Sequence, residues 1–467
     1  MLPAPLRQAA DLAARAIFWA SDAIFGPWTI ALLFGTGIFL TFRLRFVQVV
    51  RFGDAVRAMA PAGETDARGA LSPFQSFMTA LGATIGTGNI AGVATAVVSG
   101  GPGAVFWIWA YGFFATAIKF TEAVLGLKFR VVGAEGLSAG PMHYLRDGLK
   151  APRLGWLYAL IAGIAALTTT PFTQPNSIAV VWKSQFGVPT VVSGLIVAVL
   201  AWLVIIGGIR SIGRAAEKLA PLKVGLYLLG GLAVIVAHAG QIPSVLAMIV
   251  REAFSVGGVV GGTAGVGMMV AMRYGLARGI YANEAGYGTA AVAYATARSR
   301  DPLQQGLNAV MEVFIVSFVT SSISALTILV TGVWRSGLTS TAVVAQAFAT
   351  TIPRGGWIVA VCAFLFGYTT LIGWAYYGEQ FLEYIFGRRI TLPYRWLYCI
   401  LIVFGAVGKV DLVWAWGDLM NGLQIFPNLV GVLGLSGIAA AVLRGGGGAT
   451  QAGEVAVGAA DTPPART

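Results

Sequence analysis

The sequence GATIGTGNIAG, residues 82–92, lies in the middle of an apolar run that extends from Phe74 to about Ser99. A helix needs about 20 apolar residues to cross a hydrocarbon core roughly 30 Å thick, and this run is long enough. Each glycine lowers helix stability by about 1 kcal/mol relative to alanine. The four glycines of the stretch therefore predict a helix that is unwound halfway across the membrane.

An unwound segment leaves backbone N–H and C=O groups without helical partners, and hydrocarbon offers them none. The ends of the two half-helices then present amide donors to a carboxylate and carbonyl acceptors to a small cation. The alternative is that Gly82-x-x-x-Gly86 and Gly88-x-x-x-Gly92 are close-packing motifs between helices. Asn89 and the neighbouring threonines are polar at this depth and favour the unwound segment.

The composition is that of a polytopic helical membrane protein. Of 467 residues, 57% are hydrophobic and 11% charged, against about 25% charged in soluble domains. The two histidines and two cysteines give no basis for a metal centre or a disulfide framework, so we expect neither a cofactor nor catalytic residues. The net charge of +12 is spread over short loops, which indicates membrane topology rather than nucleic acid binding.

Hydropathy predicts about 11 transmembrane helices after a surface helix in residues 1–24. The predicted spans are 25–42, 72–99, 103–127, 154–180, 188–208, 219–238, 255–277, 306–332, 356–378, 393–408 and 412–442. Most of the 31 Lys and Arg residues then fall in alternate loops. The positive-inside rule places the N-terminus outside and the C-terminus in the cytoplasm of a bacterial inner membrane.

A second glycine-rich stretch, GGVVGGTAGVG (257–267), lies five spans after the first. Two interrupted helices at corresponding positions predict an inverted repeat with a binding site at the midplane, although small residues also serve helix packing. The predicted divisions are an N-terminal segment with one extra span, two five-helix repeats and a disordered tail: 1–70, 71–250, 251–444 and 445–467.

A series of motifs follows in fixed order along most of the chain: GTGNIAGVATA (86–96), GGPGAVFW (100–107), KFTEAVL (119–125), GPMHYL (140–145), ARGIYANEAGYGTA (277–290), GWAYYGEQFLEYIFG (373–387) and LMNGLQIFPNLV (419–430). Together they resemble the alanine or glycine:cation symporter family. The resemblance implies an all-α LeuT-type fold of five plus five inverted helices, preceded by one extra N-terminal helix.

The resemblance also implies import of a small neutral amino acid, alanine or glycine, coupled to sodium. The bilayer, the amino acid and sodium are then the expected partners, and the oligomeric state stays open. A proton-coupled carrier of another small solute is the alternative. A passive channel is a further one, which saturable, ion-dependent flux would distinguish. An intramembrane enzyme would need convergent His, Cys or carboxylate groups, and the spans offer mainly Lys119 and Glu122.

Within this family, TIGTGN (84–89) is similar to the unwound part of the first core helix. The substrate site implied by the resemblance is Thr84, Thr87, Gly88, Gln174, Asn176, Gly262, Thr263, Gly265 and Trp374. Gln174 and Asn176 are the candidates for the substrate ammonium, or else they hold their own helix together around Pro171 and Pro175. Trp374 is either a wall that limits substrate size or an ordinary packing aromatic.

The resemblance implies a sodium shell made of carbonyl and hydroxyl oxygens, which are ligands suited to a hard cation. Its residues are Gly82, Ile85, Thr369, Thr370 and Asn89. The alternative for the two adjacent threonines is a hydroxyl bonded to a preceding carbonyl of its own helix.

Lys119 and Glu122 are three residues apart inside a span, so we predict that they pair with each other, in a structural or gating role. Arg278, Asn283 and Glu284 are placed in the connection after the sixth core span. There Glu284 caps a short helix or bridges to Arg278 as a gate, or is a solvated loop charge.

Three positions depart from the pattern usual in the family. Ala282 replaces a serine, Tyr294 a histidine, and Val316 an aspartate of the seventh core span. The missing carboxylate at 316 leaves the identity of the coupling ion open.

Overall fold

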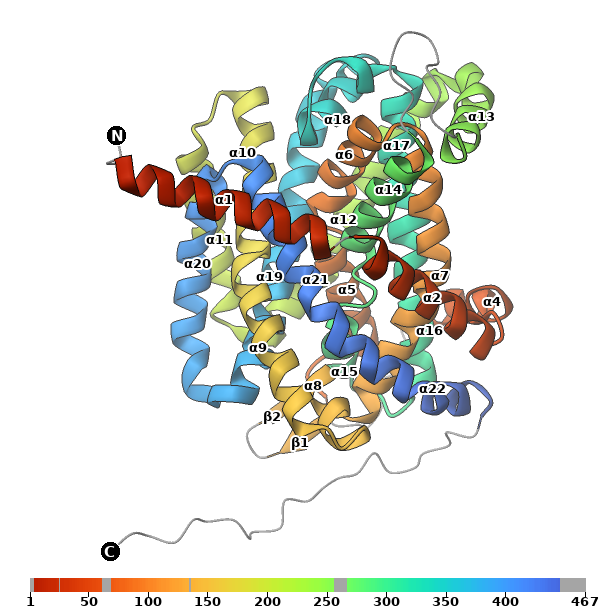
Figure 1. Ribbon diagram of the computed structural model, residues 1–467, viewed down its shortest axis with the longest axis vertical. Helices are drawn as coiled ribbons and strands as arrows, with labels where there is room; N and C mark the ends of the chain where they lie inside the picture. Colours follow the sequence, from red (N-terminus) through yellow and green to blue (C-terminus); the bar gives the residue numbers. More distant parts are fainter. Residues whose placement is uncertain (1–3, 25, 61–68, 134–135, 256–266, 446–467) are drawn as a thin grey trace, which may run out of the picture.

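The protein is a bundle of helices, seen in a computed structural model that describes all residues except 1–3, 25, 61–68, 134–135, 256–266 and 446–467 (Figure 1). Within the described residues, seven helices are long and apolar enough to cross a membrane, or up to nine when each of two bent pairs is one span. The prediction of a polytopic all-α membrane protein is therefore confirmed.

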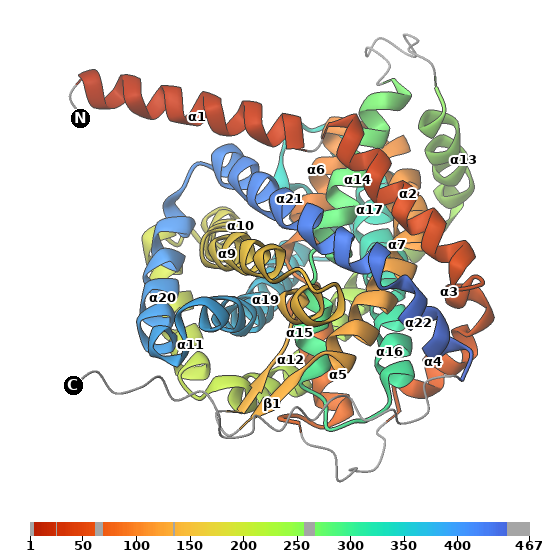
Figure 2. The same cartoon turned by 60° about the horizontal axis from the view of Figure 1, so that its bottom comes forward.

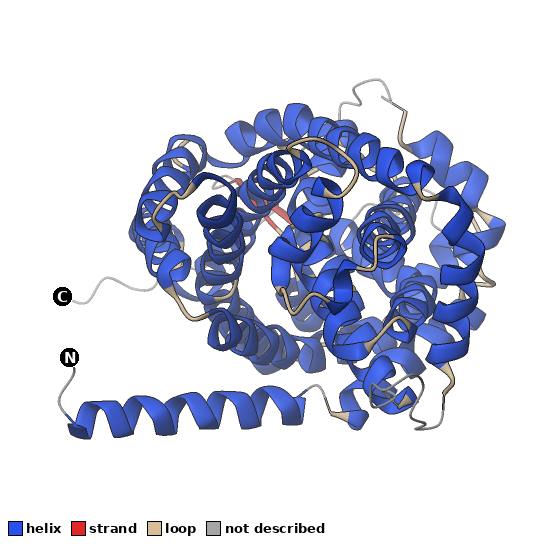
Figure 3. Ribbon diagram, turned by 90° about the horizontal axis from the view of Figure 1, so that it is seen from above, coloured by secondary structure: helices blue, strands red, loops and turns tan. Residues whose placement is uncertain are grey.

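The main helices of the bundle run along it, and the two shorter ones at 302–314 and 321–330 follow one another within a single candidate span, Pro302–Val330 (Figure 1). They are α2 (Pro27–Arg43), α7 (Gly103–Lys128), α9 (Pro152–Thr168), α10 (Thr170–Phe186), α11 (Thr190–Ile205), α12 (Gly208–Ala237), α16 (Pro302–Phe314), α17 (Ser321–Val330), α19 (Gly355–Phe386), α20 (Thr391–Val407) and α21 (Val410–Gly434). Helix α1 (Ala4–Ile24) instead lies along one edge of the bundle and packs on α21 (Figure 3).

Shorter elements cover the ends of the bundle. They are α3 (Val47–Val50), α4 (Phe52–Ala58), α8 (Pro141–His143), α13 (Ile242–Ala253), α18 (Ser340–Ala349), α22 (Ser436–Leu443) and the strands β1 (Val131–Gly133) and β2 (Gly136–Ser138). The strands form an antiparallel hairpin with Val131 opposite Ser138, near the bottom of the molecule in Figure 2.

The first glycine-rich stretch interrupts a helix, as predicted. Helix α5 (Pro73–Thr84) begins at a capping box, in which Ser72 and Gln75 exchange hydrogen bonds between side chain and backbone. After a 3₁₀ turn at Thr87–Asn89, α6 (Ala91–Gly100) continues at an angle of 56°. Because this bend falls inside the apolar run, residues 84–90 interrupt the α-helix at the centre of the bundle. We call it the first break.

A second helix is interrupted within the described residues, at a place that the sequence analysis did not predict. The stretch 257–267 lies outside the described residues except for Gly267, which precedes α14 (Met268–Asn283). The interruption is at residues 284–288, before α15 (Thr289–Ala295), and we call it the second break. The predicted polar connection after residue 277 is therefore wrong, because α14 continues to Asn283 and α15 follows it, and the residues of both helices after 277 are buried.

Backbone conformation explains why the second break falls there. Glu284, Gly286 and Gly288 have φ angles of 58°, 97° and 85°, all in the left-handed region that ends a right-handed helix. Glycine adopts this region without steric cost. A substituent on Gly288 would also lie 2.3 Å from Pro141, so that position needs glycine for space as well.

The two interrupted helices cross with opposite directions at the centre of the bundle. Helix α6 packs on α14, and α5 packs on α15. Helices α7 and α16 cover one side of this pair, while α12 and α19 pack on α5 from the other. The two breaks are thereby brought together.

The chain segments at one end of these helices are joined by backbone hydrogen bonds, which we call the clasp. Leu71, just before α5, forms a parallel bridge with Ala297, just after α15. The Leu71 N–H donates to the Thr296 carbonyl at 3.0 Å, and the Arg298 N–H donates to the Leu71 carbonyl at 2.7 Å. The Arg130 guanidinium adds hydrogen bonds to the Ala297 carbonyl and others nearby. The start of α5 and the end of α15 are thus joined by backbone hydrogen bonds.

Candidate functional site

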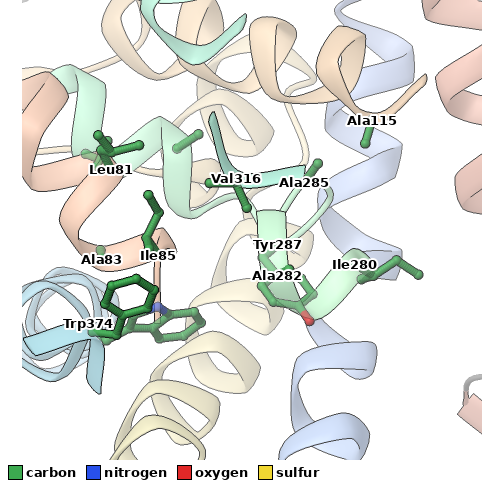
Figure 4. Packing of buried hydrophobic residues seen from close by; sticks show 14 of the residues in the cluster. Leu81, Ala83, Ile85, Ala115, Ile280, Ala282, Ala285, Tyr287, Val316 and Trp374 are labelled. Atoms are coloured by element: carbon green, nitrogen blue, oxygen red, sulfur yellow. The ribbon is translucent and has the colours of Figure 1, made fainter. Parts of the chain in front are cut away.

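A small cavity lies beside the second break, between α10, α14, α19 and α21. It is lined by Thr170, Gln174, Tyr281, Glu284, Tyr287, Thr370, Trp374 and Asn421. Figure 4 shows Ala83 and Ile85 of the first interrupted helix near Trp374, with Ala282, Ala285 and Tyr287 of the second. Gln174 and Trp374, both predicted for the substrate, are therefore placed in one cavity.

The first break approaches this cavity through contacts with α10 and α14. The Thr87 N–H and hydroxyl both donate to the Gln174 side-chain oxygen, at 2.9 Å each. A Cβ on Gly88 would lie 2.9 Å from the Tyr281 ring, so glycine permits this close packing. Gln174 thus ties α10 to the first break while it lines the cavity.

Glu284 is the one charged side chain among the described residues that line the cavity. Its carboxylate accepts hydrogen bonds from the Trp374 indole N–H at 2.7 Å and the Thr289 hydroxyl at 2.9 Å. The side chain is buried, so the predicted alternative of a solvated loop charge is wrong. A carboxylate held on an interrupted helix beside a cavity is suited to a ligand ammonium group.

The oxygens predicted for sodium do come together, but a lysine lies among them. The Lys223 ammonium of α12 donates to the Gly82 carbonyl at 2.9 Å, the Ile85 carbonyl at 2.5 Å and the Thr369 hydroxyl at 2.5 Å. We call these three oxygens the cation shell. The Thr370 hydroxyl is 3.5 Å from the Gly82 carbonyl, and Thr369 also donates to carbonyls of its own helix.

Asn89 binds a different set of partners from the cation shell. Its side-chain oxygen accepts from the Thr320 hydroxyl at 3.1 Å and the Ser321 hydroxyl at 3.2 Å. Its backbone carbonyl accepts from Ser324 at 2.5 Å. Asn89 therefore anchors the first break to the segment that joins α16 and α17.

Lys119 and Glu122 do not pair with each other, contrary to prediction. Lys119 instead forms an ion pair with Glu312 of α16 at 2.8 Å, and it donates to the Asn283 carbonyl at 2.5 Å and the Thr84 hydroxyl at 3.2 Å. Both charged side chains are fully buried. The pairing runs between α7 and α16, which sequence spacing within one helix does not reveal.

Glu122 binds the backbone of the second break. One of its carboxylate oxygens accepts from the Gly286 N–H at 3.0 Å, the Gly288 N–H at 3.1 Å and the Asn428 side chain at 2.6 Å. Lys119 therefore satisfies a backbone carbonyl just before the second break, and Glu122 satisfies two backbone amides within it.

Arg278 pairs with Asp418 of α21, so the predicted bridge from Glu284 to Arg278 is absent from the described residues. Its guanidinium also lies over the Trp414 ring, 5.2 Å from the centroid. Asn283 accepts from the Ala285 N–H at 3.0 Å and donates to Ser317 at 3.2 Å. These residues hold the end of α14 in place.

Two groups of predicted substrate residues are not found at the cavity. Gly262, Thr263 and Gly265 lie outside the described residues. The Asn176 side chain donates to the Gly405 and Gly408 carbonyls at 3.1 and 2.8 Å, so it joins α10 to the end of α20. Thr84 contacts Lys119 and Glu312 rather than the cavity lining.

Comparison with known proteins gives the family. Residues 10–456 match the model of the sodium:alanine symporter family. The sodium/alanine symporter AgcS of Methanococcus maripaludis is 38% identical over 427 residues, which cover 89% of this chain and 93% of the relative. This chain belongs to the sodium:alanine symporter family. The probable sodium/glutamine symporter GlnT of Bacillus subtilis is 33% identical, covering 91% of this chain and 89% of the relative.

The fold agrees with this family assignment. The crystal structure of MhsT in complex with L-phenylalanine superposes with a TM-score of 0.56 over 81% of this chain and 98% of that one, at 12% identity. The predicted LeuT-type architecture is confirmed, and this member of the sodium:alanine symporter family is a multi-pass membrane protein of transporter type.

Two of the departures from the family pattern meet at a residue that sequence reasoning missed. Tyr294 donates through its hydroxyl to the Glu312 carboxylate at 2.8 Å. Val316 lies four residues after Glu312 on the same segment. Glu312 is thus a buried carboxylate about one helical turn from the position where the family pattern has an aspartate. Glu312 is the single acidic residue inside the predicted span 306–332, and this isolation in an apolar segment is the sequence feature that could have identified it.

Proposed function

We propose that this protein is a secondary symporter that imports a small neutral amino acid, alanine or glycine, together with a cation. The observation that carries the proposal is the cavity beside the second break, where the buried carboxylate of Glu284 lies among the side chains of Gln174, Trp374 and other residues of α10, α14, α19 and α21. A substrate that fits among these buried side chains is a small one.

The groups around the cavity suit the two charged ends of an amino acid. Glu284 offers a carboxylate to the ammonium, in place of the predicted Gln174 and Asn176. Helix α6 begins after the first break, and a helix N-terminus favours a carboxylate. Trp374 and Tyr287 supply aromatic surface that limits the side chain to a small one. Family membership does not by itself fix the substrate, since a relative of similar identity is named for glutamine.

Sodium is the proposed coupling ion, in line with the names of the relatives. Binding of the ion and the amino acid at the breaks would stabilise one packing of the bundle, and rocking of the bundle would then expose the cavity to the other side. We place the N-terminus outside and the C-terminus in the cytoplasm, on the distribution of Lys and Arg.

The test is uptake of labelled alanine into liposomes that contain the purified protein. An inward sodium gradient is compared with an inward potassium gradient and with a proton gradient, and unlabelled glycine and glutamine are added as competitors. We expect saturable uptake with sodium, inhibited by glycine but not by glutamine. Uptake driven by protons alone would show that the coupling ion is the proton and not sodium. Inhibition by glutamine would show that the substrate class is broader than alanine and glycine. The absence of all uptake would overturn the proposal.

A further inference from the structure

The cation shell has the properties of a site for a monovalent cation, and the Lys223 ammonium group occupies it. An ammonium group has three N–H donors, and the shell offers it three oxygens at 2.5–2.9 Å. The Lys223 side chain is fully buried, at 0% exposure. All three donors are therefore satisfied without water.

The groups in direct contact with the Lys223 ammonium are neutral dipoles. Within the part of the chain that the structure describes, Lys223 forms no ion pair. The Gly82 and Ile85 carbonyls come from the C-terminal end of α5, where the helix dipole is negative. The Phe366 ring lies 5.2 Å from the ammonium and adds a cation–π contact. A sodium ion at this position would be held by the same groups.

We propose that Lys223 is a built-in cation that takes the place of sodium at the first break. The coupling ion of the proposed symport, on which this inference rests, then binds through other groups. Lys223 is a positioning residue: it fixes the Gly82 and Ile85 carbonyls against α12 and α19, and so holds α5 in place beside the cavity.

The consequence differs from that of an exchangeable ion. A bound sodium leaves its shell when the gradient is dissipated, whereas an ammonium tethered to α12 stays. The first break is therefore held in the same way whatever the sodium concentration. The sodium dependence of the protein should then be insensitive to the shell oxygens.

The test uses the purified full-length protein in detergent, with thermal unfolding measured in methylammonium, sodium or choline chloride at equal concentration. Lys223→Ala opens the shell, Lys223→Met fills the same space without a charge, and Lys218→Ala is a control at an exposed position of the same helix. Choline is too large for the shell and controls for ionic strength.

We expect Lys223→Ala to unfold at a lower temperature than the wild type and to recover by at least about 4 °C in methylammonium relative to choline. Sodium should also stabilise Lys223→Ala more than the wild type. Lys223→Met and Lys218→Ala should respond equally to methylammonium and choline. A Lys223→Ala protein that ignores both small cations, or a Lys223→Met protein as stable as the wild type, would overturn the proposal.

Thr369→Val gives a second measurement if Lys223→Ala does not fold. It removes one oxygen of the shell and keeps the lysine. We expect its stabilisation by sodium to equal that of the wild type, and loss of that stabilisation would place sodium in the shell and refute the inference. These unfolding experiments need no transport, so a failure of alanine uptake in liposomes would leave them interpretable.

Discussion

Gly86 is the residue at which the first break has least room. A Cβ there would lie 2.7 Å from the Thr370 hydroxyl and 3.0 Å from the Gln174 side-chain oxygen. We expect Gly86→Ala to lower alanine uptake at least about tenfold, because overpacking at a fixed site costs about 1–3 kcal/mol. The measurement is uptake per amount of protein in the membrane. Gly225→Ala is the matched control, since a Cβ on Gly225 meets nothing within 4 Å, and normal uptake by Gly86→Ala would contradict the role of the break.

Glu284 is the residue that the proposed function assigns to the substrate ammonium. Glu284→Gln keeps the shape but removes the charge, and a hydrogen bond to a charged group contributes about 1.5–3 kcal/mol. We expect the KM for alanine to rise about 10- to 100-fold, measured by concentration-dependent uptake. Trp374→Phe loses the indole donor and part of the ring but keeps the Glu284 charge, and it should change KM less. An unchanged KM in Glu284→Gln would mean that the ammonium binds elsewhere.

The family resemblance, rather than residue spacing, was what placed several single residues near the site. Gln174 and Trp374 are at the cavity, and Gly82, Ile85 and Thr369 do converge. What a residue meets on another helix was not predictable from spacing. Lys223, near the start of the predicted span 219–238, was not among the predicted site residues, and it fills the cation shell because tertiary packing brings α12 against α5.

At the scale of helices, the ion pair between Lys119 and Glu312 joins α7 to α16 beside both interrupted helices. Lys119→Met or Glu312→Gln leaves the other charge buried without its partner, which costs about 3–5 kcal/mol of stability. We expect both single variants to unfold at clearly lower temperatures, and the double variant to lose less than the sum of the two.

A matched control for this pair is the half-exposed pair between Arg51 and Asp54. Its removal should change stability by only about 0–1 kcal/mol. Strict additivity of the Lys119 and Glu312 variants would show that the two side chains do not interact in the folded protein.

The interrupted helices show why sequence reasoning found the break at 84–90 and did not predict the one at 284–288. The first lies in a continuous apolar run, so its glycines stood out against a helical background. In the second half, the glycine-rich stretch 257–267 drew the prediction. The break itself contains Glu284, Gly286 and Gly288, whose left-handed backbone depends on Glu122 accepting from the two glycine amides. That contact comes from α7 and is invisible in the local sequence.

At the scale of the whole molecule, stability should depend on pH through His143, which lies in α8 outside the spanning helices. Burial, with the nearby Arg146 charge, lowers the pKa of His143 to about 4, from about 6.5 in an unfolded chain. The unfolded chain then binds more protons between these values. The contribution of His143 therefore rises with pH from about 4 to 6.5 and is lost as the pH falls.

The size of this effect is at most about 3 kcal/mol, at 1.36 kcal/mol per pKa unit. The measurement is the difference in unfolding temperature between the wild type and His143→Gln at several pH values. We expect that difference to change between pH 4 and 6.5 and to be constant above pH 7. A constant difference across the whole range would show that His143 titrates normally.

The orientation of the molecule in the membrane is a further whole-molecule property. Ser244 of α13 and Arg153 of α9 are exposed. Helix α13 and helix α8, which directly precedes α9, lie at opposite ends of the bundle (Figure 1). The native cysteines are buried. We expect a membrane-impermeant maleimide to label Ser244→Cys in intact cells and Arg153→Cys only after lysis. The reverse pattern would invert the topology.

The clasp between Leu71 and Ala297 has a mechanical consequence. It joins the start of α5 to the residues just after α15, and the Arg130 guanidinium adds a hydrogen bond to the Ala297 carbonyl. Separation of the two half-helices would break these backbone hydrogen bonds, so we expect the start of α5 and the end of α15 to move as one rigid unit in any conformational change.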